Sequence, residues 1–327
     1  MLFGVTIGDP SGVGPEILLR AFAEDQIRYP VVAFGDVAVL EVYNRRLNFG
    51  VTLRAVKAPE APVSGALSVV DSGLMTAQQV TPGKLSKAAG AAARDYVVRA
   101  TSAALAGEIS AIVTLPMNKE ATQLSDPAFV GHTELIGGLC GSSDVTILLA
   151  SNDLVVTHVS THCSLAEAIR RAKKERIQTI IQITCEAMAR LNDSPRVAVA
   201  GLNPHAGENG LFGDEEIREI RPAVEWAQRR GLPVQGPLPP DTLFYLAVRR
   251  KMYDAIVCMY HDQGHVPLKL LDFENGVNVA LGLPIIRTSV DHGTAFDIAG
   301  TGKASTTSFL RALDFAAKLA EKGPLGS

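Results

Sequence analysis

Short apolar runs alternate with longer amphipathic stretches along most of the chain. The apolar runs are bounded by Gly, Pro or Asp, as buried strands are; they are Phe3–Ile7, Val31–Phe34, Ala111–Thr114, Val145–Ala150, Leu154–Val159, Arg196–Ala200 and Ala255–Met259. Helical spacing follows over residues 14–25, 86–107, 165–192, 214–230, 240–251 and 304–321. This alternation predicts an α/β fold with a mainly parallel sheet that helices cover on both faces.

The apolar runs end in polar clusters. These clusters are Gly8-Asp9-Pro10, Pro116-Met117-Asn118-Lys119, His162, Asn203-Pro204-His205 and Tyr260-His261-Asp262. In open α/β sheets, ligands bind beyond the carboxyl ends of the strands. We therefore expect the functional site to be built from these clusters.

Three of the histidines at strand ends are candidate metal ligands: His162, His205 and His261. Neutral imidazole suits zinc, cobalt, nickel or iron, and three protein ligands leave coordination positions for a substrate. His158 and His162 cannot share one ion on an extended strand, because four residues advance it by about 13 Å. We expect one of them to be structural and take His162, nearer the strand end, as the ligand. The alternative is that these histidines are satisfied core or surface residues.

Residues His132-Thr133-Glu134 follow Gly131 and suit an anionic group. The plainer interpretation is a helix start with Thr133 as its N-cap, and the two interpretations are compatible.

Two glycine-rich segments are candidates for ligand contact. Gly8–Glu16 is a tight turn that opens a helix, but the chain has no Gly-x-Gly-x-x-Gly after a strand, so a conventional Rossmann site is unsupported. In residues 291–303, the glycines would allow a ligand to approach the backbone closely. The Asp297 carboxylate could accept hydrogen bonds from a ribose or an adenine. A surface loop that caps the next helix is the alternative.

Composition narrows the function classes. The 327 residues are 47% hydrophobic and 20% charged, which is typical of a globular enzyme. The net charge of −3 argues against nucleic acid as a partner.

There is no basic leader and no apolar stretch of about 18 residues, so we expect a cytoplasmic protein without a membrane span. The four cysteines form no Cys-x-x-Cys pair. Residues 323–327 resemble the remnant of a cleaved tag.

An ordered set of motifs resembles the 4-hydroxythreonine-4-phosphate dehydrogenase family of pyridoxal phosphate (pyridoxine) biosynthesis, including paralogues that act on D-threonate or D-erythronate 4-phosphate. The motifs are Gly8-Asp9-Pro10-x-Gly12-x-Gly14-Pro15-Glu16, Gly131-His132-Thr133-Glu134, Thr161-His162, Asn203-Pro204-His205-Ala206-Gly207-Glu208, Pro237-Leu238-Pro239-Pro240-Asp241-Thr242, Tyr260-His261-Asp262-Gln263-Gly264, Gly276-Val277-Asn278 and Arg287–Thr294. Each is weak alone, but their order along the chain makes the resemblance specific.

The resemblance implies an NAD(P)-dependent oxidoreductase with one divalent metal (zinc, cobalt or magnesium) per site. It assigns the metal to His162, His205 and His261, and the phosphorylated hydroxy-acid substrate to His132, Thr133, Lys269, Asn278 and Arg287. It further implies a homodimer whose active site combines residues of both subunits. Lys119 as a proton donor and Asp241 beside the metal are expected catalytic residues.

The segment from Asp291 to Gly302 is similar to the adenosine-binding loop of isopropylmalate and isocitrate dehydrogenases. This similarity implies NAD(P) contacts at Gly293, Asp297, Gly300 and Gly302, and an α/β/α architecture with two lobes around a cleft and a non-Rossmann NAD site. We expect a nucleotide-side lobe of residues 1–123 and 270–322, and a metal and dimerisation lobe of residues 124–269.

The sequence departs from the biosynthetic enzymes at Leu115–Glu120 and at His158–His162, which favours a phosphorylated sugar acid over an amino-bearing substrate. Aromatic cis-dihydrodiol dicarboxylate dehydrogenases resemble the same family and remain an alternative. A metal-dependent phosphatase or lyase without a nucleotide is a second alternative, and a binding protein without activity is a third.

Overall fold

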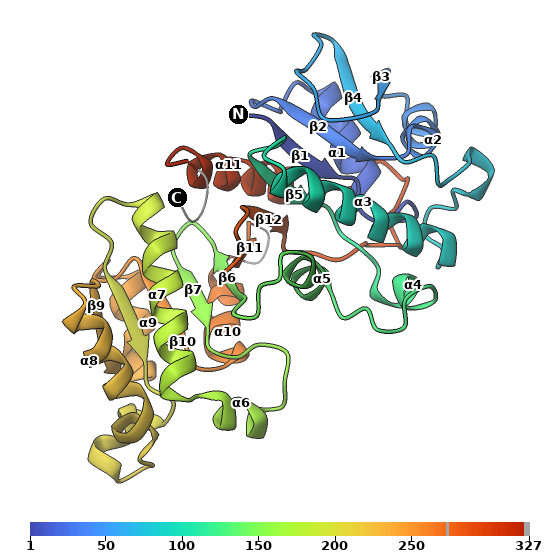
Figure 1. The fold of residues 1–327 in the computed structure, drawn as a ribbon. Helices are drawn as coiled ribbons and strands as arrows, with labels where there is room; N and C mark the ends of the chain where they lie inside the picture. Colours follow the sequence, from blue (N-terminus) through green and yellow to red (C-terminus); the bar gives the residue numbers. More distant parts are fainter. Residues whose placement is uncertain (273–274, 324–327) are drawn as a thin grey trace. The chain divides into compact units, whose positions relative to one another are not determined.

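The structure is a computed structural model that describes residues 1–272 and 275–323, so Pro324–Ser327 of the expected tag remnant lie outside the described residues. The chain forms two compact units (Figure 1). Unit 1 comprises Met1–Ser143 and the described residues from Leu283 onward, and unit 2 comprises Asp144–Gly282.

Unit 1 contains a parallel sheet in the order β3-β4-β2-β1-β5-β12. The strands are β1 (Phe3–Thr6), β2 (Val31–Gly35), β3 (Thr52–Val56), β4 (Ala66–Asp71), β5 (Ala111–Thr114) and β12 (Arg287–Val290). Residues of β1, β2 and β5 are buried without alternation, because both faces of these strands are covered.

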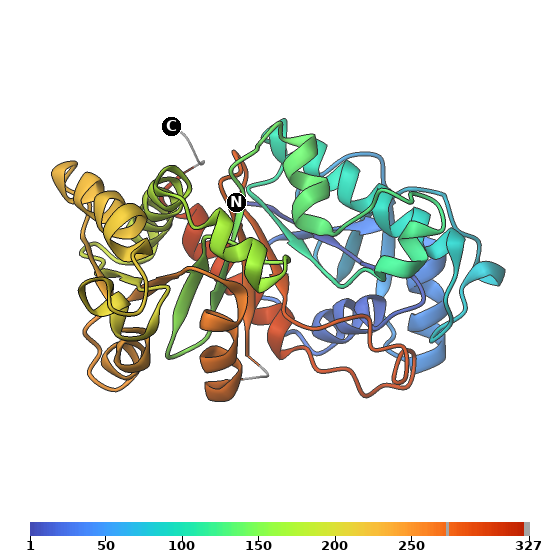
Figure 2. The same cartoon turned by 90° about the horizontal axis from the view of Figure 1, so that it is seen from below.

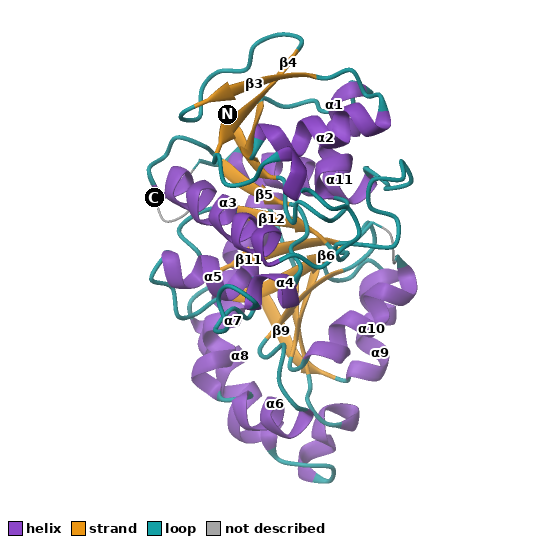
Figure 3. Cartoon of the chain, turned by 90° about the vertical axis from the view of Figure 1, so that its right-hand side faces the viewer, coloured by secondary structure: helices purple, strands orange, loops and turns teal. Residues whose placement is uncertain are grey.

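The helices of unit 1 form a layer on each face of its sheet. They are α1 (Gly14–Ala23), α2 (Val37–Leu47), the short η1 (Ala77–Gln79), α3 (Lys87–Leu105), α4 (Lys119–Gln123), α5 (His132–Leu139) and α11 (Thr307–Ala320). Helices α1, α2 and α11 lie on one side of the strands, and α3 and α5 on the other (Figures 2 and 3).

Unit 2 contains a mixed sheet in the order β11-β6-β7-β10-β8-β9. Its strands are β6 (Thr146–Ala150), β7 (Val155–His158), β8 (Val197–Ala200), β9 (Val234–Leu238), β10 (Ala255–Cys258) and β11 (Val277–Leu281). The β11–β6 and β6–β7 pairs are antiparallel, whereas β7, β10, β8 and β9 run parallel. A mainly parallel sheet is therefore confirmed.

Helices also cover both faces of the second sheet (Figure 3). They are α6 (Leu165–Arg171), α7 (Lys174–Leu191), the turn η2 (Pro204–Gly210), the π-helix η3 (Glu216–Ile220), α8 (Arg221–Arg229), α9 (Pro240–Val248) and α10 (His261–Leu271). Leu243 of α9 and Leu268 of α10 pack with Val156, Ala198 and Ile256 of the strands in one apolar core.

The prediction of one helix over 165–192 was wrong. The chain leaves helical geometry at Ala172 and Lys173, and α7 begins anew at Lys174. The carboxylate of Glu219 accepts hydrogen bonds from the Lys174 amide and the Lys173 ammonium, each at 2.9 Å. A distant side chain therefore supplies the cap of the second helix, which local sequence spacing does not reveal.

The unit boundaries also differ from the expected lobes. Residues 124–143 belong to unit 1, where α5 contacts α3, and residues 270–282 belong to unit 2, where β11 pairs with β6. The expected boundaries did not include β11 as a strand, because the motif with Asn278 indicates a ligand contact.

Among the described residues, no helix is both long and apolar enough to span a membrane.

Gly90 of α3 should be intolerant of any side chain. A Cβ at this position would overlap the backbone of Ala121 in α4, whereas a Cβ at Gly138 of α5 would meet no atom within 4 Å. We expect Gly90→Ala to destabilise the protein by about 1–3 kcal/mol. Gly138→Ala should stabilise it by up to ~1 kcal/mol, because alanine favours the helix.

Urea unfolding of both variants beside the unsubstituted protein measures these changes. Equal stability of the two alanine variants would contradict the close packing of α3 on α4.

Candidate functional site

Three parallel strands of unit 2 present the predicted histidines at one edge of the sheet. β10 lies between β7 and β8, with Ile256 in register with Val156 on one side and Ala198 on the other. His162 follows β7, His261 follows β10 and His205 follows β8. The segment that carries His261 is therefore flanked by the other two.

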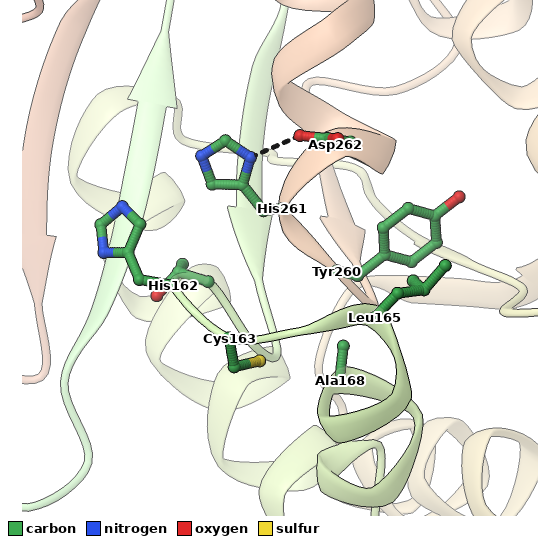
Figure 4. A pocket seen from close by; sticks show the side chains of 8 residues that line it. His162, Cys163, Leu165, Ala168, Tyr260, His261 and Asp262 are labelled. Atoms are coloured by element: carbon green, nitrogen blue, oxygen red, sulfur yellow. Dashed lines mark hydrogen bonds and ion pairs between the residues drawn. The ribbon is translucent and has the colours of Figure 1, made fainter.

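His162 and His261 both line one pocket, with their rings side by side (Figure 4). The pocket has a volume of about 490 Å³ and is lined by 161–163, Leu165, Ala168 and 260–262. The two imidazole centroids are 5.7 Å apart. Asp262 Oδ1 lies 2.7 Å from His261 Nδ1. A carboxylate only accepts, so Nδ1 carries the proton and Nε2 keeps a free lone pair.

His205 lies in a turn with unusual backbone geometry. Five successive residues, His205–Asn209, have positive φ values between 42° and 76°. The buried Glu216 stabilises the start of this turn, because Oε1 accepts from the amides of Leu202 and Asn203 at 2.7 Å and Oε2 accepts from the Asn203 side chain at 2.9 Å. Sequence reasoning did not assign Glu216 a role.

Asp241 is paired with His205, since its Oδ2 lies 3.5 Å from His205 Nδ1. Both side chains are more than half exposed. The structure thus brings His162 and His261 together and places His205 with Asp241. Within residues 1–272 and 275–323, no three His, Cys, Asp or Glu side chains of this chain are grouped as a metal site.

His158, which we expected to be a structural histidine, forms a pair with His265 that the sequence did not predict. His158 ends β7 and is fully buried, and its Nε2 lies 3.2 Å from His265 Nδ1. Burial, with a smaller contribution from His265, lowers the pKa of His158 to about 3. The spacing of four residues between His261 and His265 on α10 was the available signal.

Arg287 and His132 form the basic part of unit 1. Arg287 begins β12 and is 3% exposed, and its Nε and Nη2 donate to Thr114 Oγ1 at 3.1 and 2.7 Å. Burial lowers the pKa of Arg287 to about 10, although Glu134 opposes the shift. Burial and the Arg287 charge also lower the pKa of His132 well below its ordinary value. A neutral imidazole beside a buried guanidinium suits an anionic ligand.

The remaining predicted substrate residues lie in different settings. Thr133 is in the first turn of α5, whose N-cap is Gly131, so the expectation that Thr133 caps the helix was wrong. Lys269 is half-buried on α10, and Asn278 lies on β11. The buried atoms His132 Nε2 and Asn278 Oδ1 have no hydrogen-bond partner in the described part of the chain. Lys119 is the exposed first residue of α4.

The expected cofactor loop is held by helix α1. The carboxylate of the buried Glu16 accepts from the Gly300 and Ala304 amides at 3.0 and 2.9 Å. Gly300 and Gly302 have φ values of 69° and 79°, so backbone geometry also explains these two glycines. Gly293 and Asp297 are exposed.

Asp9, which belongs to the polar cluster expected after the first strand, carries a buried carboxyl group in the turn after β1. Its Oδ1 accepts from the Ser11 amide at 2.8 Å, whereas its Oδ2 has no partner among the described residues. Burial raises the pKa of Asp9 to about 6, against the lowering effect of the backbone amides of Ser11 and Asn118.

The protein is thus an α/β protein in which the ends of mainly parallel strands carry histidines, an arginine and buried polar atoms. The chain belongs to the PdxA family: the family model described as "Pyridoxal phosphate biosynthetic protein PdxA" matches residues 26–316. The resemblance inferred from the motifs is thereby confirmed.

Relatives of known name resemble the chain over nearly its whole length. D-threonate 4-phosphate dehydrogenase of Salmonella typhimurium is 46% identical over 321 residues, which cover 97% of this chain and 98% of the relative. The structure of 4-hydroxythreonine-4-phosphate dehydrogenase from Klebsiella pneumoniae is 44% identical with a TM-score of 0.86, covering 98% of this chain and 99% of that chain. A terephthalate 1,2-cis-dihydrodiol dehydrogenase from Burkholderia xenovorans is 33% identical with a TM-score of 0.73, covering 97% and 98%.

The stability of the protein should depend on pH through Asp9. The pKa of Asp9 rises from 3.8 to about 6 on folding, so the native state ionises this group at a cost that the unfolded chain does not bear. That cost is fully present above pH 6 and disappears as the pH falls towards 4. At about 1.4 kcal/mol per pKa unit, Asp9→Asn should stabilise the protein by up to about 3 kcal/mol at pH 8.

Thermal unfolding between pH 4 and 8 measures the difference, which should shrink as the pH falls through 6. The exposed Asp25, replaced by Asn, is the matched control and should show no such trend. A stability gain of Asp9→Asn that does not change with pH would contradict the assignment.

Proposed function

We propose that this chain is a metal-dependent NAD(P) dehydrogenase that oxidises the hydroxyl group of a small 4-phosphorylated hydroxy acid, with decarboxylation. D-threonate 4-phosphate is the first substrate to test, followed by D-erythronate 4-phosphate and 4-hydroxythreonine 4-phosphate. The full-length similarity to dehydrogenases named for two of these compounds supports the reaction class.

The observation that carries the proposal is the arrangement of β7, β10 and β8. Their parallel pairing directs the segments with His162, His261 and His205 to the same sheet edge. His162 and His261 already face one pocket with ring centroids 5.7 Å apart. Three imidazole ligands with open positions are typical of a catalytic metal site.

The imidazole nitrogens of these residues fit a divalent metal such as zinc or cobalt, whereas magnesium prefers oxygen ligands. The contact of His261 Nδ1 with Asp262 leaves Nε2 available, and Asp241 Oδ2 lies 3.5 Å from Nδ1 of His205. Carboxylates in this position orient metal-binding histidines. When bound, the metal would supply Lewis-acid chemistry that makes the substrate hydroxyl more acidic.

We propose that the residues that the family resemblance assigns to the substrate recognise its carboxylate, phosphate and hydroxyl groups. Arg287 offers a planar fork for a carboxylate or phosphate, and the neutral His132 beside it can donate or accept a hydrogen bond. Thr133 supplies a hydroxyl group, and Lys269 a positive charge. The buried Asn278 Oδ1 lacks a partner among the described residues, which suits a hydroxyl donor on the substrate.

When bound, the nucleotide would supply a hydride acceptor for the carbinol carbon, and the hydroxyl proton would leave to solvent. The resulting ketone, β to the carboxylate, would lose carbon dioxide from its α-carbon to leave an enolate, and Lys119 would donate the proton that this α-carbon takes up. The loop with Gly293, Asp297, Gly300 and Gly302 would hold the nucleotide. Its two ligand-facing candidates, Gly293 and Asp297, are exposed.

We further propose a homodimer with a shared active site. Leu211 and Phe212, directly after the turn that carries His205, are 70% and 46% exposed. Large apolar side chains next to a polar site are typical of a protein interface. A second copy of the chain is the partner that the family resemblance implies.

An assay with a substrate panel tests the proposed reaction. Purified protein is incubated with NAD or NADP and each phosphorylated acid, and the absorbance of the reduced nucleotide is followed before and after treatment with a chelator. We expect turnover that the chelator abolishes and that added zinc, cobalt or magnesium restores. Turnover of only an aromatic cis-dihydrodiol would favour the reaction named for the Burkholderia xenovorans relative. Phosphate release without a nucleotide would favour a phosphatase.

His205 should be essential for turnover. Because φ of His205 is 53°, asparagine is a better replacement than alanine, since it tolerates left-handed geometry and leaves the turn intact. We expect His205→Asn to lower kcat by at least ~100-fold, with little change in Tm, because the metal loses a ligand.

Asn209→Gly in the same turn is the matched control, because φ at Asn209 is 57° and glycine accepts that geometry. It should retain most activity. If His205→Asn keeps more than a few per cent of the activity, His205 does not bind the metal.

A further inference from the structure

A stack of histidines lies directly behind the pocket in unit 2. The rings of His261 and His265, one helical turn apart on α10, are parallel within 9° and have centroids 3.6 Å apart. The His158 ring follows, with its centroid 4.7 Å from that of His265. The stack therefore runs from the pocket surface at His261 to a fully buried side chain at His158.

One assignment of the ring protons satisfies these contacts of the stack. His158 Nδ1 lies 3.4 Å from the Ile147 carbonyl oxygen, and His265 Nδ1 lies 3.1 Å from the His261 carbonyl oxygen. Carbonyl oxygens only accept, so both Nδ1 atoms are protonated. His158 Nε2 is then a lone-pair acceptor and receives the second bond of His265 Nδ1–H, at 3.2 Å.

His158, at the buried end of the stack, is closely packed. A Cβ at Gly264 would lie 2.6 Å from His158 Nε2 and 3.0 Å from Cys258 Sγ, so the absence of a side chain at Gly264 is what admits the His158 ring beneath α10. On the other side, the backbone carbonyl of His158 accepts from Thr146 Oγ1 at 2.6 Å. His158 is thus a rigid support for the His265 ring.

We propose that His265 and His158 are positioning residues for His261. His158 fixes the tautomer and orientation of His265, and the face of the His265 ring holds the His261 imidazole. Asp262 holds the His261 ring from its edge. Together these contacts keep Nε2 of His261 on the side of the His162 ring (Figure 4). This inference rests on the proposed function in one respect, namely that His261 binds a metal.

The first experiment uses the metal-free protein, labelled with nitrogen-15 in its histidines. Long-range nitrogen–proton NMR spectra report the tautomer of each ring. We expect His158, His265 and His261 each in a single Nδ1–H form. An Nε2–H form at His158 or His265 would overturn the proposal.

Substitutions at His265 then distinguish the effect of its ring face on His261 from the effect of its ring nitrogens. We expect His265→Ala to leave His261 as a mixture of tautomers, because its ring loses the stacked partner. His265→Phe keeps an aromatic face and should restore most of the single form. The control is Thr184→Val, which removes the buried hydrogen bond between Thr157 and Thr184 beside the same strand and should leave the His261 spectrum unchanged.

Titration calorimetry with zinc alone gives the second readout. We expect His265→Ala to raise the Kd for zinc by about 10-fold or more, the range seen when groups that orient metal ligands are lost. His265→Phe should lie near the unsubstituted protein, and Thr184→Val should match it. An equal loss of zinc affinity in His265→Ala and Thr184→Val would mean that the stack only supports the fold. That outcome would overturn the proposal.

Failure of the proposed function has a different signature. If the unsubstituted protein binds no zinc, cobalt or magnesium, the metal-dependent reaction is wrong. The NMR result still decides the positioning role, because the tautomer of His261 in the metal-free protein is measured independently of any metal. An unchanged His261 spectrum in His265→Ala would refute that role.

Discussion

The candidate site depends on the parallel pairing of β7, β10 and β8. Because neighbouring parallel strands end at the same edge of a sheet, residues about a hundred positions apart in sequence become neighbours. The register of Val156, Ile256 and Ala198 sets which segments lie side by side. His261, directly after the central strand, has the rings of His162 and His265 as neighbours.

Several groups of the protein lie in settings that are unfavourable on their own. Asp9 Oδ2, His132 Nε2 and Asn278 Oδ1 are buried without a hydrogen-bond partner in the described residues, and His205 lies in a turn of left-handed backbone. Buried polar atoms are normally paired and left-handed backbone is strained outside glycine, so the surrounding structure must maintain each of these settings. For the turn of His205 this support comes from Glu216, whose carboxylate accepts from the amides of Leu202 and Asn203.

Much of the architecture could be predicted from local patterning. The strands at Ala111–Thr114, Thr146–Ala150 and Ala255–Cys258 lie where apolar runs bounded by turn residues indicated them. Patterning failed where distant groups decide the structure. The helix expected over 165–192 is broken because Glu219 caps a second helix at Lys174. α10 contains Gly264 and Pro267, which weaken a helical signal, and its formation depends on packing against β7 and β10.

The sequence alone determined the α/β class, the family and the residue types of the candidate site, because these depend on periodicity and on motifs that are local in the chain. Only the tertiary structure decided how those residues combine. It paired His162 with His261, placed Asp241 beside His205, and revealed His158, His265 and Glu216 as supports. Those pairings depend on strand order and on burial, which arise from contacts between segments distant in sequence, and no local pattern encodes them.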